Sequence, residues 1–282
     1  MNNSSFNIFM DDEAVSNHYG ISGILDSILK GLESSGKNLQ SLIPNDLAPI
    51  DEFHTRGKES TIEIANLAQL QSHHHVLDVG CGLGGSARYI ANEFGCSVMG
   101  VDLTDEYIDV ANQLTEFVNL SDKASFKQAS ALELPFSSDS FDVVWTEHTQ
   151  MNISDKEKFY SELSRVLKPK GRLVFHDIFG TDNVPHYPTP WAEHGSLSSL
   201  CTQEEAREAI EKSNLAVDKW IDKSKLSMEF FKAMVNKAET SGPPPLGFHL
   251  LMGKTAKEKL LNQARNLEEN RVTVVQGTAL KN

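Results

Sequence analysis

The chain has 282 residues, of which 39% are hydrophobic and 23% charged, the balance of an ordinary globular protein. Its formal net charge is −13 and no basic cluster stands out, so we expect no nucleic-acid partner. No apolar run approaches the roughly 20 residues of a membrane span, and the first residues do not read as a signal peptide, so we expect no membrane partner. The three cysteines fit no zinc spacing, which favours a cytoplasmic protein.

The N-terminal part of the sequence predicts two helices and the loops between them. Residues 12–35 repeat apolar side chains at helical spacing, and residues 58–70 do the same. Between them lies a loop marked by prolines, which ends in the polar and aromatic loop of residues 51–57. We expect the first of these helices to act as a lid.

From residue 76 onward, strands and helices alternate. The strands are rich in valine, as is typical of a parallel sheet that is buried on both faces. The predicted strands are residues 76–79, 97–101, 125–128, 141–146 and 173–177. The predicted helices are residues 86–94, 105–119 and 155–167, and the sequence LKPKG predicts a turn before the last strand. The alternation predicts an α/β fold with a Rossmann-like, mostly parallel sheet and helices on both faces.

The alternation weakens after residue 180, where residues 181–201 predict a loop. Thr202 and Glu205 have the spacing of a capping box and predict the start of a helix. The remaining predicted elements are strands over residues 216–221 and 271–276, and helices over residues 225–239 and 254–268. With the last two strands added to the five above, the predicted sheet has seven strands. The expected parts are an N-terminal lid (1–57), a cofactor-binding core (58–180) and a cap that completes the sheet (181–282).

The stretch VLDVGCGLGG, residues 76–85, connects the first predicted strand of this sheet to a helix. In an open parallel sheet, ligands bind in the crevice at the carboxyl ends of the strands. Glycines there adopt positive φ and let a ligand approach the backbone, and the following helix attracts an anion. We interpret Gly80, Gly82, Gly84 and Gly85 as a nucleotide-binding turn.

Two acidic residues narrow the choice of nucleotide. Asp102 closes the second strand, about 20 residues beyond the turn, and is placed to bind the ribose hydroxyls of NAD or of S-adenosylmethionine. Asp78 lies near the end of a buried strand, where a charge needs a partner. The ammonium and sulfonium of S-adenosylmethionine suit this carboxylate, whereas the pyrophosphate of NAD does not. The alternative is that Asp78 only binds backbone N–H groups of the turn.

The order of the motifs resembles that of the class I S-adenosylmethionine-dependent methyltransferases. The motifs that carry the resemblance are VLDVGCGLGG, GVDL (100–103), LPF (134–136), FDVV (141–144) and LKPKG (167–171). Together they extend over about residues 74–178. The GGSAR ending of the first motif and Ser130 are similar to enzymes of the sarcosine/dimethylglycine N-methyltransferase type, while quinone and sterol C-methyltransferases share much of the same core.

The resemblance implies an enzyme that transfers a methyl group from S-adenosylmethionine to a small-molecule acceptor. The preferred acceptor atom is an amine nitrogen. The alternative is a C-methyltransferase that acts on a quinone, a sterol or another natural product, and a nicotinamide-dependent oxidoreductase or a non-catalytic cofactor-binding module are further alternatives. The sequence leaves the oligomeric state open, with a homodimer as one option.

The resemblance also assigns roles around the methionine and ribose parts of the cofactor. Asp78, Gly80 and Gly82 would line the methionine part. Asp102 would bind the ribose hydroxyls, and Leu103 would lie beside the adenine.

Further assignments concern the adenine and the two ends of the methionine part. Ser130 stands where many relatives have an aspartate that binds the adenine amino group, and Ala131 and Leu132 would flank the ring. Glu147 closes the fourth strand, where the methyl group should point. Arg56, in the N-terminal loop, would bind the methionine carboxylate because a guanidinium pairs with a carboxylate through two hydrogen bonds.

The candidate catalytic residues are His148 and Tyr19. His148 follows the fourth strand and would act as a base or hold a polar group of the acceptor; the alternative is a structural role. Tyr19 lies on the lid helix. Trp191 and Phe231 could contact a cationic group, although core packing is the favoured interpretation. The adjacent histidines at positions 73–75 predict a turn rather than a ligand set, and we expect no metal.

Overall fold

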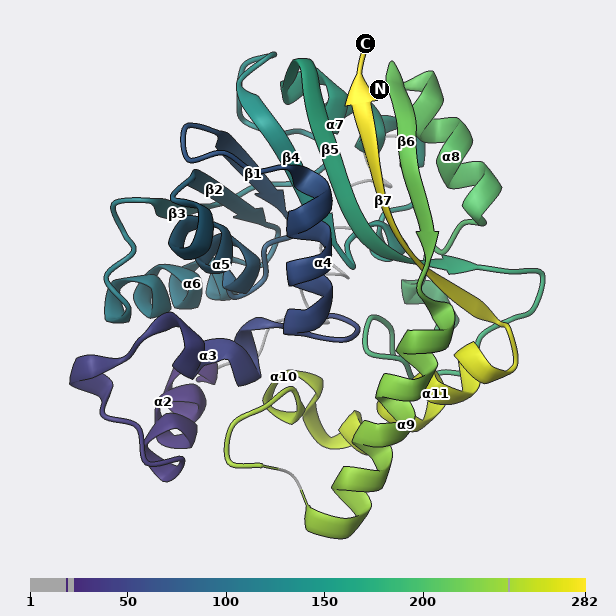
Figure 1. Cartoon of the computed structure of the whole chain (residues 1–282). Helices are drawn as coiled ribbons and strands as arrows, with labels where there is room; N and C mark the ends of the chain where they lie inside the picture. Colours follow the sequence, from purple (N-terminus) through teal and green to yellow (C-terminus); the bar gives the residue numbers. More distant parts are fainter. Residues whose placement is uncertain (1–18, 20–22, 243) are drawn as a thin grey trace, which may run out of the picture.

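The computed structural model describes residue 19 and residues 23–242 and 244–282, and its centre is a twisted sheet (Figure 1). The strands are β1 (His75–Val79), β2 (Ser97–Asp102), β3 (Ala124–Gln128), β4 (Phe141–Glu147), β5 (Leu167–Gly180), β6 (Leu215–Asp222) and β7 (Val272–Lys281). Their order in the sheet is β3-β2-β1-β4-β5-β7-β6. β7 is antiparallel to both of its neighbours, β5 and β6, and the other neighbouring pairs are parallel. The predicted seven-stranded, mostly parallel, Rossmann-like sheet is confirmed.

Helices cover both faces of this sheet. Those described are α2 (Ile24–Ser34), α3 (Pro44–Asp51), α4 (Lys58–Ala68), α5 (Gly85–Phe94), α6 (Asp105–Phe117), α7 (Lys156–Val166), α8 (Gln203–Lys212), α9 (Ser224–Ser241), α10 (His249–Met252) and α11 (Ala256–Glu268). In β1, Val76 packs in one cluster with Ile64 of α4 and Ile90 of α5. The next residue, Leu77, packs on the other face with Phe159 of α7. Because both faces are buried from Val76 onward, this part of the strand is apolar except at Asp78.

Five helices gather beyond the carboxyl ends of the parallel strands, in the lower half of Figure 1. They are α2, α3, α9, α10 and α11. Among them α2 contacts α10, and α9 contacts α11. Much of the lid helix predicted over residues 12–35 lies outside the described residues, and its described part consists of Tyr19 and α2. No helix in the part of the chain that the structure describes has the length and apolarity to cross a bilayer.

Two local features differ from the sequence-based expectation. The proline-marked loop contains α3, in which Pro44 takes the first helical position, where its missing N–H is harmless and its fixed φ suits a helix. The sequence LKPKG is not a turn before a strand. β5 already begins at Leu167, directly after α7, and its register with β4 shifts between Phe141 and Val143. The capping box of Thr202 and Glu205 at the start of α8 is confirmed.

The end of α3 packs tightly against the start of α5, and this contact requires a glycine. A Cβ atom at Gly85 would lie 2.1 Å from the carbonyl oxygen of Asp51. We predict that Gly85→Ala lowers the free energy of unfolding in urea by about 1–3 kcal/mol, because α3 must move away. Gly195→Ala is the control, since its Cβ would find its nearest neighbour at 3.4 Å. Equal stability of the two variants would show that α3 is not held in this way.

Candidate functional site

The glycine turn follows β1 and is held in place by the end of β2. The N–H groups of Gly80 and Cys81 donate to the carbonyl oxygen of Val101 at 2.8 and 3.0 Å. The N–H of Gly82 donates to Oδ2 of Asp102 at 2.9 Å. Gly80 and Gly82 have φ values of 77° and 51°, which glycine adopts at little cost. The turn is therefore a rigid backbone surface rather than a flexible linker.

The four glycines of the turn serve two different purposes. Gly80 and Gly82 line a cavity, as expected for residues that admit a ligand. Gly84 and Gly85 do not line it. A Cβ at Gly84 would lie 2.5 Å from the ring of Phe126, and Gly85 makes room for α3. Gly80 and Gly82 therefore stay candidates for contact with a ligand, whereas Gly84 and Gly85 have packing roles.

The cavity brings together every predicted site residue except Arg56. The predicted site residues that line the cavity are Tyr19, Asp78, Gly80, Gly82, Asp102, Leu103, Ser130, Ala131, Leu132, Glu147 and His148. They come from the ends of β1, β2 and β4, from the loop after β3 and from the N-terminal segment. The carboxyl ends of adjacent parallel strands meet at one edge of a sheet, which explains why residues so far apart in sequence converge here.

Arg56 does not line the cavity, and its guanidinium is already paired. Its Nη1 and Nη2 donate to the two carboxylate oxygens of Glu63, both at 2.7 Å. Nζ of Lys223 lies 3.0 Å from the same carboxylate. The assignment of Arg56 to the methionine carboxylate is thus contradicted by the structure, because the fork of the guanidinium is occupied by an acid of the protein itself.

Asp102 is anchored but keeps capacity for a ligand. Its Oδ2 accepts the N–H of Gly82 and its Oδ1 accepts the N–H of Thr104, each at 2.9 Å. A carboxylate oxygen can accept a second hydrogen bond, so both oxygens can still accept a hydroxyl from the cavity. Burial raises the pKa of Asp102. The two backbone bonds fix the orientation of the carboxylate and oppose this rise.

Asp78 is a buried acid with one carboxyl oxygen that lacks a hydrogen-bond partner in the described part of the chain. The residue is 2% exposed, and the oxygen without a partner is Oδ2. Burial, followed by the carboxylates of Glu147 and Asp102, raises the pKa of Asp78 well above its usual value. The N–H groups of Gly80 and Gly82 are bound by β2, and a backbone hydrogen bond from Ala87, just after the turn, opposes the rise in the pKa of Asp78. A cationic ligand group would relieve the cost of this burial.

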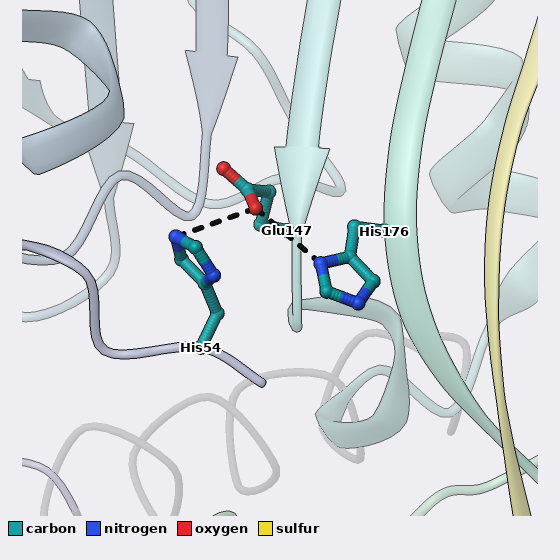
Figure 2. Close-up of side chains that lie close together, drawn as sticks. All are labelled: His54, Glu147 and His176. Carbon is teal, nitrogen blue, oxygen red and sulfur yellow. Dashed lines mark ion pairs between the residues drawn. The ribbon is translucent and has the colours of Figure 1, made fainter. Parts of the chain in front are cut away.

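Glu147 closes β4 and is fixed by two donors. Its Oε1 accepts a hydrogen bond from the hydroxyl of Ser86 at 2.6 Å and one from Nε1 of Trp145 at 2.9 Å. Its Oε2 points between Nε2 of His54 and Nδ1 of His176, at 3.4 and 3.5 Å (Figure 2). Burial alone would raise the pKa of Glu147, but the two histidines and Ser86 outweigh it and lower the pKa to about 2. Glu147 is therefore a carboxylate.

His54 carries the charge that balances this carboxylate. Burial alone would lower its pKa, but the carboxylates of Glu147 and Glu52 outweigh burial and raise the pKa of His54 to about 9. Its Nε2 lies 3.0 Å from Oε2 of Glu52 and 3.1 Å from the hydroxyl of Thr61. Sequence reasoning placed His54 only in a polar loop.

His148 is a neutral imidazole at the cavity wall. Burial, followed by the neighbouring His176 and His54, lowers the pKa of His148 well below its usual value. Its backbone has a φ of 50°, which is unusual for a residue with a side chain. Its Nε2 lies 3.5 Å from the backbone N–H of Thr55. The arrangement can accept a proton or a hydrogen bond from a ligand in the cavity.

Tyr19 contributes a hydroxyl to the opposite side of the cavity. The hydroxyl donates to Oδ1 of Asn152 at 3.1 Å, and the ring lies edge-on to Tyr107. Burial, followed by the carboxylates of Asp102 and Asp177, raises the pKa of Tyr19 above its usual value. Tyr19 therefore stays protonated and acts as a hydrogen-bond donor rather than as a base.

The core of the chain matches a known family. A family profile described as a methyltransferase domain matches residues 77–175, the stretch that contains the glycine turn, Asp102 and Glu147. Residues 77–175 thus match a methyltransferase domain. The resemblance to S-adenosylmethionine-dependent methyltransferases is confirmed over this stretch.

Individual relatives agree with this family. Methyltransferase GfsG from Streptomyces halstedii is 32% identical over 162 residues, which cover 57% of this chain and 56% of that protein. Sarcosine/dimethylglycine N-methyltransferase from Halorhodospira halochloris is 30% identical over 144 residues, 51% of each chain. The chain thus spans about half the length of these curated relatives.

A solved structure matches more of the chain, at lower identity. Geranyl diphosphate C-methyltransferase from Streptomyces coelicolor A3(2) has a TM-score of 0.71 and 17% identity, covering 96% of this chain and 98% of that one. At this identity the similarity concerns the fold. It extends well beyond the methyltransferase domain, to the elements on either side of it.

One wall of the cavity was largely missed, because most of it is built by residues outside the stretch 77–175. Trp191 and Phe231, considered as candidates, do line it and are buried. The apolar wall also contains Met151, Ile178, Phe230, Met234, Phe248, Leu251, Met252 and Leu260. Gln263 lies at this wall, fully buried, and both polar atoms of its amide lack a partner among the described residues. No lysine or arginine is found among the described residues that line the cavity.

The pairing of Arg56 with Glu63 has a measurable consequence for pH stability. The hydrogen bonds from Arg56, opposed by burial, lower the pKa of Glu63 from 4.5 to about 2. Because the folded-state pKa is the lower one, ionised Glu63 stabilises the fold above the unfolded pKa, and this contribution is lost as the pH falls toward 2. We predict that the difference in unfolding free energy between wild type and Glu63→Gln is constant above about pH 5 and shrinks below it.

The measurement is urea unfolding of both proteins between about pH 7 and about pH 3. Glu59→Gln is the control, since the Glu59 side chain is 79% exposed and lies 3.7 Å from Arg56. A difference for Glu63→Gln that stays constant down to the lowest pH would show that the pair does not stabilise the fold.

Proposed function

We propose that this protein binds S-adenosylmethionine in the cavity and transfers its methyl group to a small-molecule acceptor. The observation that carries the proposal is the buried carboxyl group of Asp78 beside a rigid glycine turn, with Oδ2 lacking a hydrogen-bond partner among the described residues. The α-ammonium of the cofactor would bind near Asp78, and its ribose hydroxyls would bind Asp102. The adenine would lie by Leu103 and Ser130.

Methyl transfer from a sulfonium is a direct displacement, in which the positively charged sulfur is the leaving group. The protein must align the acceptor atom, the methyl carbon and the sulfur, and orientation of this kind can contribute about 7–11 kcal/mol. The neutral imidazole of His148 would take a proton from an acceptor that has to lose one, and the hydroxyl of Tyr19 would orient the acceptor. An acceptor that arrives as a neutral amine needs no base.

The cavity favours an apolar acceptor over a small amino acid. Sarcosine and dimethylglycine carry a carboxylate, which needs a cationic or strongly hydrogen-bonding partner when buried. The described cavity residues include no lysine or arginine, and the charged imidazole of His54 already lies beside the carboxylates of Glu52 and Glu147. The cavity lining includes four acids, Asp51, Asp78, Asp102 and Glu147. We propose instead an acceptor with a large apolar body and one hydroxyl, carbonyl or amine that hydrogen-bonds to Gln263. This favours the natural-product alternative over the sarcosine-like one.

We propose that the chain works in three parts, a lid (1–57), a core (58–180) and a cap (181–282). The lid contributes Tyr19 to the cavity, and the cap contributes the apolar wall. The sheet itself extends across the last boundary, because β6 and β7 complete it. The parts therefore describe roles around the cavity rather than separately folding units.

The direct test of the proposed function is a labelled-methyl screen. The full chain is incubated with methyl-labelled S-adenosylmethionine and one acceptor at a time. One set of acceptors consists of apolar alcohols, phenols and amines, and the comparison set consists of sarcosine and dimethylglycine. We predict that the label enters apolar acceptors and not the amino acids. Labelled dimethylglycine or betaine would overturn the acceptor assignment, and the absence of any labelled product would favour a non-catalytic module.

Cofactor binding is tested separately at Asp102. We predict that Asp102→Ala weakens binding of S-adenosylhomocysteine at least about tenfold in calorimetric titration, because two ribose hydroxyls lose their acceptor. Asp105→Ala is the control, since Asp105 is exposed at the start of α6 and does not line the cavity. Unchanged affinity of Asp102→Ala, or binding of NAD in preference, would place a different ligand in the cavity.

The role of His148 is tested with an asparagine, which tolerates positive φ better than most residues. With an acceptor that must lose a proton, we predict that His148→Asn lowers kcat by about 10²–10⁴-fold and leaves the affinity for S-adenosylhomocysteine unchanged. His73→Asn, an exposed position, serves as the control. Wild-type turnover in His148→Asn would leave His148 a structural role only.

A further inference from the structure

Three metal-ligating side chains from separate elements converge beside the cavity (Figure 2). His54 precedes α4, Glu147 ends β4, and His176 lies in β5. One ligand atom of each lies within 4.8 Å of the other two. The side chains are 6%, 5% and 0% exposed, respectively, so this is not a cluster of solvated surface groups. Such a convergence of buried donors calls for an explanation, since each donor is costly to bury without a partner.

The distances within the cluster are long for hydrogen bonds. Oε2 of Glu147 is 3.4 Å from Nε2 of His54 and 3.5 Å from Nδ1 of His176, whereas N–H···O bonds are typically about 2.7–3.2 Å. Ligands of a tetrahedral Zn²⁺ with bonds of about 2.0–2.1 Å are separated by about 3.3 Å. These two separations are close to the spacing of ligands around one ion, and all three ligand atoms lie within 4.8 Å of one another.

The surroundings also orient the three groups toward one point. Oε1 of Glu147 is occupied by Ser86 and Trp145, while its Oε2 has no hydrogen-bond partner among the described residues. Neither ring nitrogen of His176 has a hydrogen-bond partner among them. Nδ1 of His54 lies 3.0 Å from the hydroxyl of Ser60, a contact of the kind that fixes the ring of a metal-bound histidine.

We propose that His54, Glu147 and His176 form a three-ligand site for a divalent transition-metal ion at the wall of the cavity. Two imidazole nitrogens and one carboxylate suit Zn²⁺, Co²⁺ or Ni²⁺, whereas Mg²⁺ and Ca²⁺ prefer oxygen ligands. Nε2 of His54 also lies 3.0 Å from Oε2 of Glu52, so metal binding replaces the proton shared by these two groups. This proposal departs from the sequence-based expectation of no metal.

The test uses the full chain without an affinity tag, stripped with a chelator and titrated with Co²⁺, Zn²⁺ and Mg²⁺. We expect one equivalent of Co²⁺ to bind with a visible d–d absorption band, Zn²⁺ to displace it, and Mg²⁺ to have no effect. His176→Ala and the closely isosteric Glu147→Gln should each weaken Co²⁺ binding at least about tenfold. Zn²⁺ should raise the Tm of the wild type and not that of these variants.

The adjacent histidines at positions 73 and 74, the first exposed and the second half-buried, provide the matched control, because they could bind metal adventitiously. Binding that survives in a His73→Ala/His74→Ala variant supports the proposal. Binding that is lost there, that persists unchanged in His176→Ala, or that is absent from the wild type overturns it. Should both site variants fail to fold, anomalous diffraction from Zn²⁺-soaked wild-type crystals decides: a peak among the three side chains supports the site, and no peak there refutes it.

Discussion

The clamp between the glycine turn and the end of β2 is the constraint on which the site depends. The carbonyl of Val101 accepts two N–H groups of the turn, and the carboxylate of Asp102 accepts a third. These bonds satisfy the backbone of the turn internally, so that its surface is free to face a ligand. They also bring Asp78 and Asp102 to one cavity, where Oδ2 of Asp78 lacks a hydrogen-bond partner among the described residues and Asp102 is oriented by the turn itself.

Contacts at the same turn also hold the N-terminal segment against the core. Arg88, fully buried in α5, donates to the carboxylate of Asp51 at the end of α3 and to the carbonyl of Leu83 in the turn. Gly85 admits the backbone of α3 at this point. The segment that carries Tyr19 and the loop with His54 is therefore positioned relative to the glycine turn, although it precedes the first strand by many residues. A cavity with a polar, acidic floor and an apolar wall results.

Local and periodic features of the sequence were sufficient to predict the sheet, the turn and the polar side of the cavity, but not its apolar wall. Valine-rich strands and the glycine spacing can be recognised within a few residues of the sequence. Pairings between distant segments cannot be recognised in this way, because they form only when the chain folds. The carboxylate that occupies Arg56 lies a helical turn into α4, the helix of Pro44 depends on packing against Gly85, and Glu147 acquires its two histidine neighbours only when β4, β5 and the N-terminal loop meet.

The most direct test of the central claim is a crystal structure of the full chain with S-adenosylhomocysteine. The account predicts that the homocysteine lies along the backbone of Gly80 and Gly82, with its ammonium toward Asp78 and the ribose hydroxyls on the carboxylate of Asp102. A structure in which the ligand occupies another place, with side chains filling the space above the turn, would contradict it.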